Sequence, residues 1–441
     1  MFSADFDRSQ HTLKSRLWGV FLGSLVMIAI SLAVVNPNTM MVTLPCLLLA
    51  LVISSYFRGG LGNLRPSFGA VSTSAAVFLG YGMLSALWAE RPVTALAWPL
   101  LSAVTAVCCG IAVRNFLAEP RRNILHIGEG VWVGMLIGLV YLAIEISSHQ
   151  WIKLSLFNYL HLGPDDLKPR DHFTWDGVRI TRIDASDLTK NIAPIPSLIW
   201  ASLLAIKGTL RPRTSTFVML ATLAFAAWVV GISENETAKV AFAGGALIFL
   251  VATLRKHWSE RLLQMGWVIA CLAIVPISLA AYRANLHNAA FVQPSLQHRF
   301  IMWNRTAEEA LKSPVLGIGA GMTYWKYDAS HELHENEKYP RNLRDVHNSY
   351  LQIWYELGVI GATLLCLFGL AIIQRFKTLP DKIAPFAHAT FVSIAATIGS
   401  TWGMWRPWFV CTFAFATVLF AIAIRSMIRR DGTPGLPAPL D

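Results

Sequence analysis

Long apolar runs, separated by short polar segments, are the dominant pattern of this chain. A helix needs about 20 apolar residues to cross the hydrocarbon core of a bilayer. Twelve runs approach that length, at about 17–35, 39–56, 69–88, 95–113, 125–146, 191–206, 214–231, 236–254, 262–282, 349–373, 384–402 and 407–424. Pro194 and Pro196 interrupt the short run 191–206, which predicts a broken helix or one that begins outside the membrane. The pattern predicts an all-α integral membrane protein with about 12 transmembrane helices.

Composition narrows the class further. The chain is 54% hydrophobic and only 14% charged, whereas soluble domains carry about 25% charged residues. This excludes a disordered chain, a fibrous repeat and a soluble enzyme. The formal net charge is +11, but the basic residues lie in short clusters between apolar runs, which is typical of membrane orientation and not of nucleic-acid binding. All six cysteines fall inside apolar runs, so no disulfide framework is expected.

The distribution of Lys and Arg predicts the orientation. With the N-terminus inside, the cytoplasmic segments hold 20 basic residues, whereas the four short outer loops hold only Arg91 and Arg406. Both termini are therefore predicted to be cytoplasmic, and two long polar loops fall on the periplasmic side, where binding and chemistry would concentrate. The predicted division is membrane helices 1–5 (1–146), a periplasmic loop (147–190), helices 6–9 (191–282), a large periplasmic loop (283–348), helices 10–12 (349–424) and a cytoplasmic tail (425–441).

The most specific motif is His347-Asn348, followed by Gly358 and Gly361. A histidine at the junction of a loop and a helix titrates near neutral pH and can accept a proton from a sugar hydroxyl. A lone loop histidine is more often a solvated side chain or a helix cap, but the full pattern H-[N/S/Q]-x9-G-x2-[G/T/Y] is far more selective. Gly358 and Gly361, three apart on a helix, are expected to let another helix approach closely.

With this pattern the chain resembles the O-antigen ligase family, and more broadly the O-antigen ligase/polymerase superfamily of bacterial envelope glycosyltransferases. Two further segments support the resemblance. Arg299 opens a segment similar to the family's R-x3-W…P-x2-G-x-G, and the stretch from Arg182 to Asn191 resembles its Arg…Asn element. Lys239 stands where the family often has an arginine. The resemblance covers residues from about 180 to 365.

The resemblance implies a GT-C-like enzyme of the bacterial inner membrane with a periplasmic active site. It implies inverting, metal-independent transfer of a glycan from an undecaprenyl-diphosphate carrier to lipid A–core oligosaccharide, without a cofactor. His347 would be the base, and Arg182 and Arg299 would bind the diphosphate, because a guanidinium grips phosphate oxygens in a fork. Further candidate ligands are Arg179, Arg305, Asn191 and Asn348.

Other functions fit part of the pattern. A polymerase would use the same donor and extend a carrier-linked glycan instead. A secondary transporter would place ionisable groups near the bilayer midplane, but few lie inside the runs, and Glu356 is the deepest. A non-catalytic scaffold is the remaining alternative. The segment 331–335, HELHE, lacks the HExxH register of a zinc site, and no metal is expected. Gly317–Gly321 favours a tight turn over a dinucleotide loop. The expected partners are the two glycan substrates and membrane lipids.

Overall fold

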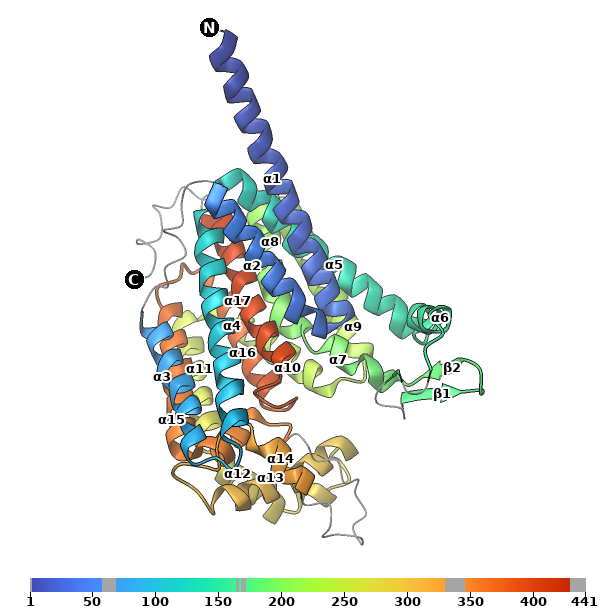
Figure 1. The fold of residues 1–441 in the computed structure, drawn as a ribbon, viewed down its shortest axis with the longest axis vertical. Helices are drawn as coiled ribbons and strands as arrows, with labels where there is room; N and C mark the ends of the chain where they lie inside the picture. Colours follow the sequence, from blue (N-terminus) through green and yellow to red (C-terminus); the bar gives the residue numbers. More distant parts are fainter. Residues whose placement is uncertain (1, 58–68, 164–165, 168–171, 330–345, 429–441) are drawn as a thin grey trace. The chain divides into compact units, whose positions relative to one another are not determined.

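The computed structural model describes residues 2–57, 69–163, 166–167, 172–329 and 346–428, and most of them are helical (Figure 1). The chain forms two compact units. Unit 1 comprises Met1–Arg65, Ile111–Gly245 and Thr412–Leu436, and unit 2 comprises Pro66–Gly110, Ala246–Cys411 and Pro437–Asp441. Each unit is therefore assembled from segments that lie far apart in the sequence.

The apolar helices agree with the hydropathy pattern. Within the described residues, eight helices are long and apolar enough to cross a membrane, or up to ten if each of two bent pairs is one span. The eight are Leu17–Val35, Ala70–Leu87, Pro92–Ala118, Arg121–Ser147, Pro212–Ile232, Glu236–Leu254, Ser349–Phe376 and Pro407–Met427. Two shorter apolar helices, Pro37–Ile53 and Ala384–Ile398, coincide with the remaining predicted runs. The membrane-helical class is confirmed, while the number of 12 spans stays a prediction.

Two parallel helices form the centre of unit 1. α1 (Phe2–Val35) lies along α5 (Arg121–Ser147), and glycines let the two backbones approach. A Cβ atom added at Gly23 would lie 2.5 Å from the His126 carbonyl oxygen, and one at Gly134 would lie 2.5 Å from that of Met27. Because the contacts advance along both helices in the same direction, α1 and α5 run parallel. Such small-residue stripes are the usual packing device in membranes.

The interrupted apolar run forms a bent pair of elements in unit 1. η5 (Ala185–Leu188) and α7 (Thr189–Ile192) meet α8 (Ile195–Thr209) at an angle of 48°, with Pro194 at the break. The expected break in this helix is therefore confirmed. The end of α8 returns to the start of α5, where the Trp132 indole N–H donates to the Thr209 hydroxyl over 3.2 Å, so α8 runs antiparallel to α5. The other helices of this unit are α2 (Met40–Phe57), preceded by η1 (Pro37–Thr39), and α9 (Pro212–Ile232).

The polar segment 147–190 contains elements that the all-α prediction did not include. β1 (Phe173–Trp175) and β2 (Ile180–Ile183) form an antiparallel hairpin, in which Thr174 lies opposite Arg182. The buried Phe173, Ile180 and Ile183 pack against apolar side chains of α6 (Trp151–Tyr159). Strands this short leave too few alternating positions to stand out in a hydropathy pattern.

In unit 2, α15 (Ser349–Phe376) packs against α3 (Ala70–Leu84) and α11 (Lys256–Leu272). The Trp267 indole donates to the Cys366 carbonyl and the Trp354 indole to that of Cys271, so α11 and α15 are antiparallel. α12 (Ile274–Arg283) bends away from α11 by 72°.

The predicted large loop is partly helical. It contains η6 (Leu286–Asn288), α13 (Pro294–Ala310) and α14 (Met322–Ala329), which lie with α12 at one end of α15 (Figure 1). The remaining elements are η3 (Ser85–Leu87) and α16 (Ala384–Ile398) in unit 2, and α4 (Pro92–Ala118), α10 (Glu236–Leu254) and α17 (Pro407–Ile428), which pass from one unit into the other.

Candidate active site

The first turns of α15 end in a break at Gly358, whose φ of 63° and ψ of −166° are not helical. A segment of turns, residues 314–319, lies against this break. Its Ile318 N–H donates to the Tyr355 carbonyl over 3.2 Å and its Gly319 N–H to that of Glu356 over 2.8 Å. In return, the Val359 N–H donates to the Pro314 carbonyl over 2.8 Å. The segment thus satisfies backbone groups that the broken helix would leave without partners.

Glycine is required on both sides of this contact. Gly317 has a φ of +69°, and a Cβ atom there would lie 2.3 Å from the Glu356 carbonyl carbon. At Gly358 a Cβ atom would lie 2.1 Å from the Val315 carbonyl oxygen. Both positions combine a left-handed backbone with a close backbone approach, and only glycine tolerates that combination. The predicted tight turn at Gly317–Gly321 is confirmed, since Gly317, Gly319 and Gly321 all have positive φ.

The predicted role of Gly358 and Gly361 as a smooth helical face is wrong in its geometry. Gly358 interrupts the helix, and the backbone that approaches it belongs to the segment 314–319 and not to another helix. A Cβ atom at Gly361 would lie 2.2 Å from the Leu357 Cβ of the same helix. The break folds Leu357 over Gly361, so the two glycines of the motif mark a kink in α15 that packs against a non-helical segment.

The Glu356 side chain fixes the next part of the same segment. Its carboxylate is fully buried and accepts hydrogen bonds from the backbone N–H of Gly321 and Thr323, at 2.8 Å and 3.2 Å. It also accepts from the Gln352 amide at 2.9 Å and the Trp405 indole at 2.5 Å. A buried carboxylate persists when donors surround it in this way. Glu356 therefore connects the start of α14 to α15 and to the turn before α17.

Trp303 connects α13 to the residue before the motif histidine. Its indole N–H donates to the Val346 carbonyl over 3.0 Å, and Val346 and Leu351 share a small apolar core with Ala307 of α13. His347 follows with a φ of 51° and is half-buried. Asn348 is the N-cap of α15, because its side-chain oxygen accepts the Leu351 N–H over 3.1 Å. These contacts fix the backbone on both sides of His347.

Arg299 lies on α13 one turn before Trp303, about 6 Å along the helix axis. Its side chain is half-buried, and burial lowers the pKa of Arg299 below its ordinary value. A guanidinium nevertheless stays protonated in proteins, so Arg299 is a partly desolvated permanent cation. Arg305, two residues after Trp303, is also half-buried on α13. Unit 2 therefore combines Arg299, Arg305, His347 and Asn348 in connected elements.

The other predicted residues belong to unit 1. Arg182 lies on β2 and is exposed, and no described residue forms an ion pair with it. Arg179 lies in the hairpin turn, where its guanidinium is 3.5 Å from the Asp176 carboxylate. Asn191 on α7 is buried, and its side-chain amide donates to the Val35 carbonyl. Lys239 on α10 pairs with Glu236 over 2.7 Å.

The described residues hold no group of three or more His, Cys, Asp or Glu side chains arranged for a metal ion. The HELHE segment at 331–335 lies outside the described residues.

Two residues of this site received no role from the sequence. Glu356 stood out only as the deepest ionisable residue of an apolar run, and its four donors come from segments up to 49 positions away. Trp303 belongs to the R-x3-W motif, but nothing in the motif reveals that its partner is the Val346 carbonyl. Both residues act through contacts between distant segments, which a single sequence does not contain.

Eight to ten apolar helices within the described part of the chain indicate a multi-pass membrane protein. Residues 199–366 match the family model described as O-antigen ligase. This match agrees with the resemblance drawn from the motifs, which is thereby confirmed.

Relatives from Rickettsia extend the similarity to most of the chain. A Rickettsia felis protein whose name includes the words "polysaccharide ligase" is 22% identical over 377 residues, which cover 84% of this chain and 84% of the relative. A similarly named Rickettsia conorii protein is 21% identical over 363 residues, covering 80% of each chain. A third, from Rickettsia typhi, is 22% identical over 366 residues, covering 80% of this chain and 81% of its own.

Proposed function

We propose that this protein is an O-antigen ligase. It transfers polysaccharide from undecaprenyl diphosphate to lipid A–core oligosaccharide at the periplasmic face of the bacterial inner membrane. The observation that carries the proposal is the joining of two motif segments, 299–319 and 347–361, in one unit. The Trp303–Val346 hydrogen bond and the backbone contacts around Gly358 connect them. Similarity to an O-antigen ligase family model and to polysaccharide ligases supports glycan transfer as the reaction class.

The charge distribution in unit 2 supports a periplasmic site. His347 precedes the first residue of α15, whereas Arg375 lies in its last turn. Near that far end, the Lys256 ammonium is 3.1 Å from the Asp381 carboxylate and 2.8 Å from the Leu379 carbonyl. Clusters of Lys and Arg mark the cytoplasmic ends of spans. The candidate site lies at the opposite end of α15, which is the outer end.

The glycan donor is already activated, because its leaving group is a lipid diphosphate. The enzyme must stabilise the negative charge that develops on that group. Arg299 fits this role, since a half-buried guanidinium interacts more strongly with phosphate than a fully hydrated one does. We assign Arg182 the same role and favour it over Arg179, whose guanidinium already pairs with Asp176.

His347 is assigned the role of general base. Its imidazole accepts the proton of the acceptor hydroxyl while that oxygen attacks the anomeric carbon, and the bond to the carrier diphosphate breaks on the opposite face of the sugar. A single displacement of this kind inverts the anomeric configuration, and it requires neither a metal ion nor a cofactor. Asn348 and Trp303 hold the backbone around the base and are positioning residues.

Reconstitution of the purified protein tests the proposal. The donor is carrier-linked glycan, and the acceptor is either lipid A–core or a second carrier-linked repeat. We expect the wild type to extend lipid A–core, and His347→Ala to lose at least about 100-fold in rate, because a positioned base contributes about 10²–10⁴-fold. His257→Ala, an exposed histidine of α11, is the matched control. Extension of the carrier-linked repeat alone would identify a polymerase. Undiminished transfer by His347→Ala would show that His347 is not the general base.

A further inference from the structure

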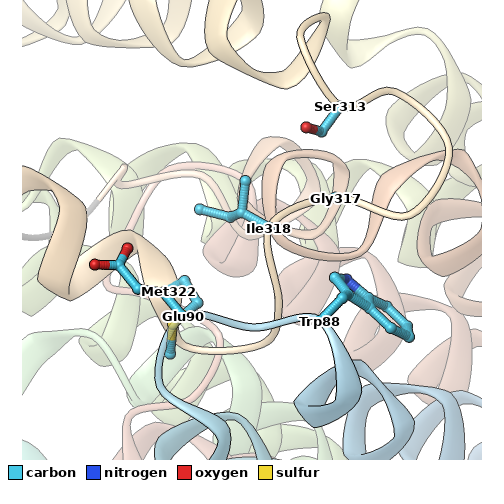
Figure 2. Close-up of a pocket in the computed structure, with 6 residues that line it drawn as sticks. All are labelled: Trp88, Glu90, Ser313, Gly317, Ile318 and Met322. Carbon is cyan, nitrogen blue, oxygen red and sulfur yellow. The ribbon is translucent and has the colours of Figure 1, made fainter.

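A pocket of about 230 Å³ lies next to the segment 314–319. Its lining residues are Trp88, Glu90, Ser313, Gly317, Ile318 and Met322 (Figure 2). All six belong to unit 2. One wall comes from the turn between η3 and α4, and the other comes from the glycine-containing segment that contacts the break in α15.

Two polar groups of this pocket have no partner among the described residues. Glu90 is exposed and forms no ion pair with a described residue. The Ser313 hydroxyl likewise makes no hydrogen bond with the described residues. The Trp88 indole nitrogen is buried, so Trp88 contributes its ring, and not its N–H, to the pocket.

The neighbouring cation does not neutralise Glu90. The Arg91 guanidinium lies 3.9 Å from the centre of the Trp325 ring on α14, in a cation–π contact. The Trp88 ring packs against Tyr81, with ring centres 5.9 Å apart. The carboxylate of Glu90 and the indole of Trp88 are thus presented on a wall that other contacts hold in place.

This combination matches the chemistry of a sugar ring. A carboxylate accepts hydrogen bonds from two neighbouring hydroxyls, a serine hydroxyl donates and accepts, and an indole ring provides an apolar face. Pockets for drug-sized ligands measure about 300–1,000 Å³, so a pocket of about 230 Å³ is suited to one sugar unit and not to a chain.

We propose that the Trp88–Glu90–Ser313 pocket binds one sugar residue of a glycan substrate. This inference rests on the proposed function, since it assigns a glycan subsite next to the proposed transfer site. The Gly317 segment connects the two, because one side of it lines the pocket and its backbone contacts Glu356 of α15. The shared chemistry is a hydroxyl-rich sugar ring, which the donor and the acceptor both contain.

Equilibrium binding tests the pocket without relying on turnover. The parent protein is His347→Ala in detergent micelles, and saturation-transfer NMR measures binding of two soluble probes. These are deacylated lipid A–core oligosaccharide and the glycan released from its carrier. Glu90→Gln, Trp88→Phe and Ser313→Ala are introduced into this parent. Glu309→Gln on α13 and Trp258→Phe on α11 are matched controls outside the pocket, and thermal unfolding verifies that each variant is folded.

We expect Glu90→Gln to raise the Kd of one probe by about tenfold, which is typical of losing a hydrogen bond to a charged group. Trp88→Phe, which reduces the ring face, and Ser313→Ala should weaken binding of the same probe by smaller factors, and the controls should leave the binding of both probes unchanged. If binding of the core oligosaccharide is weakened, the pocket is an acceptor subsite. If binding of the released glycan is weakened, it is a donor subsite. The proposal that the pocket binds a sugar would be contradicted if all three pocket variants bound both probes unchanged, or if the parent bound neither probe. Failure of the proposed function would appear separately, as absence of transfer to lipid A–core by the wild-type protein in the reconstituted assay.

Discussion

Arg299 and His347 belong to different elements, and Trp303 is the residue that relates them. It lies one turn after Arg299 on α13 and donates its indole N–H to the carbonyl of the residue before His347. This hydrogen bond from α13 therefore fixes the backbone immediately before His347.

The first prediction concerns the shape of that cation. Arg299→Lys keeps the positive charge but removes the planar fork that grips two phosphate oxygens. We expect the transfer rate to fall by about 100-fold, the usual effect of losing one donor to a developing charge. Initial rates with carrier-linked glycan and lipid A–core measure it.

Arg283→Lys is the matched control, because Arg283 is exposed in the last turn of α12. Turnover by Arg299→Lys at the wild-type rate would remove the diphosphate role of Arg299.

Residue types and spacing predicted the members of this site more easily than their partners. The pattern around His347 was recognisable because its types and intervals are local. The role of Asn348 as the N-cap of α15 follows from its position before a helix. The four donors to Glu356 come from residues 321, 323, 352 and 405, and no periodicity indicates that these residues meet.

At the scale of helices and strands, the most important feature is the break in α15 at Gly358. Hydropathy predicted one continuous span over this region, because a single glycine changes the apolar count very little. The actual helix changes direction at Gly358, and residues 314–319 supply the missing hydrogen bonds. The short hairpin β1–β2 was missed for a related reason, since its strands span only three and four residues.

The second prediction is that Gly358→Ala destabilises the protein. The substitution forces a Cβ atom to 2.1 Å from the Val315 carbonyl oxygen at a φ of +63°. Strain at such a position costs about 1–3 kcal/mol before the clash is counted, so we expect a loss of about 2 kcal/mol or more. Thermal unfolding of the purified protein measures the change as a lower Tm.

Gly266→Ala on α11 is the control, because a Cβ atom added there meets nothing within 4 Å. It should be neutral or stabilising, since alanine is the better helix former by about 1 kcal/mol. Equal Tm values for the two variants would contradict the proposed need for glycine at the break.

On the scale of the whole molecule, the helix directions inside each unit agree with the alternation that the hydropathy map requires. α1 and α5 are parallel, as the predicted first and fifth spans should be, and α11 and α15 are antiparallel, as the ninth and tenth should be. The hydropathy pattern was sufficient for this level of description, while the orientation inferred from the basic clusters stays a prediction. The grouping of distant segments into two units depends on packing that hydropathy does not encode.

The third prediction concerns orientation. In a background without native cysteines, Lys312→Cys is placed after α13 and Lys382→Cys after α15. A membrane-impermeant thiol reagent added to intact spheroplasts should label Lys312→Cys and spare Lys382→Cys, because only the former lies at the proposed outer end. Permeabilised cells should label both. The reverse pattern would place the candidate site in the cytoplasm, where the proposed reaction has no substrate.

The central proposal is that Arg299 and His347 form one transfer site, with the donor diphosphate held beside the base. The most direct measurement pairs Arg299→Cys with His347→Cys in the background without native cysteines and applies a short bifunctional thiol reagent to membranes. The proposal predicts efficient crosslinking of this pair and none between Lys382→Cys and His347→Cys. If residues 299 and 347 each react fully with a monofunctional reagent but never crosslink, the proposal of a shared site is contradicted.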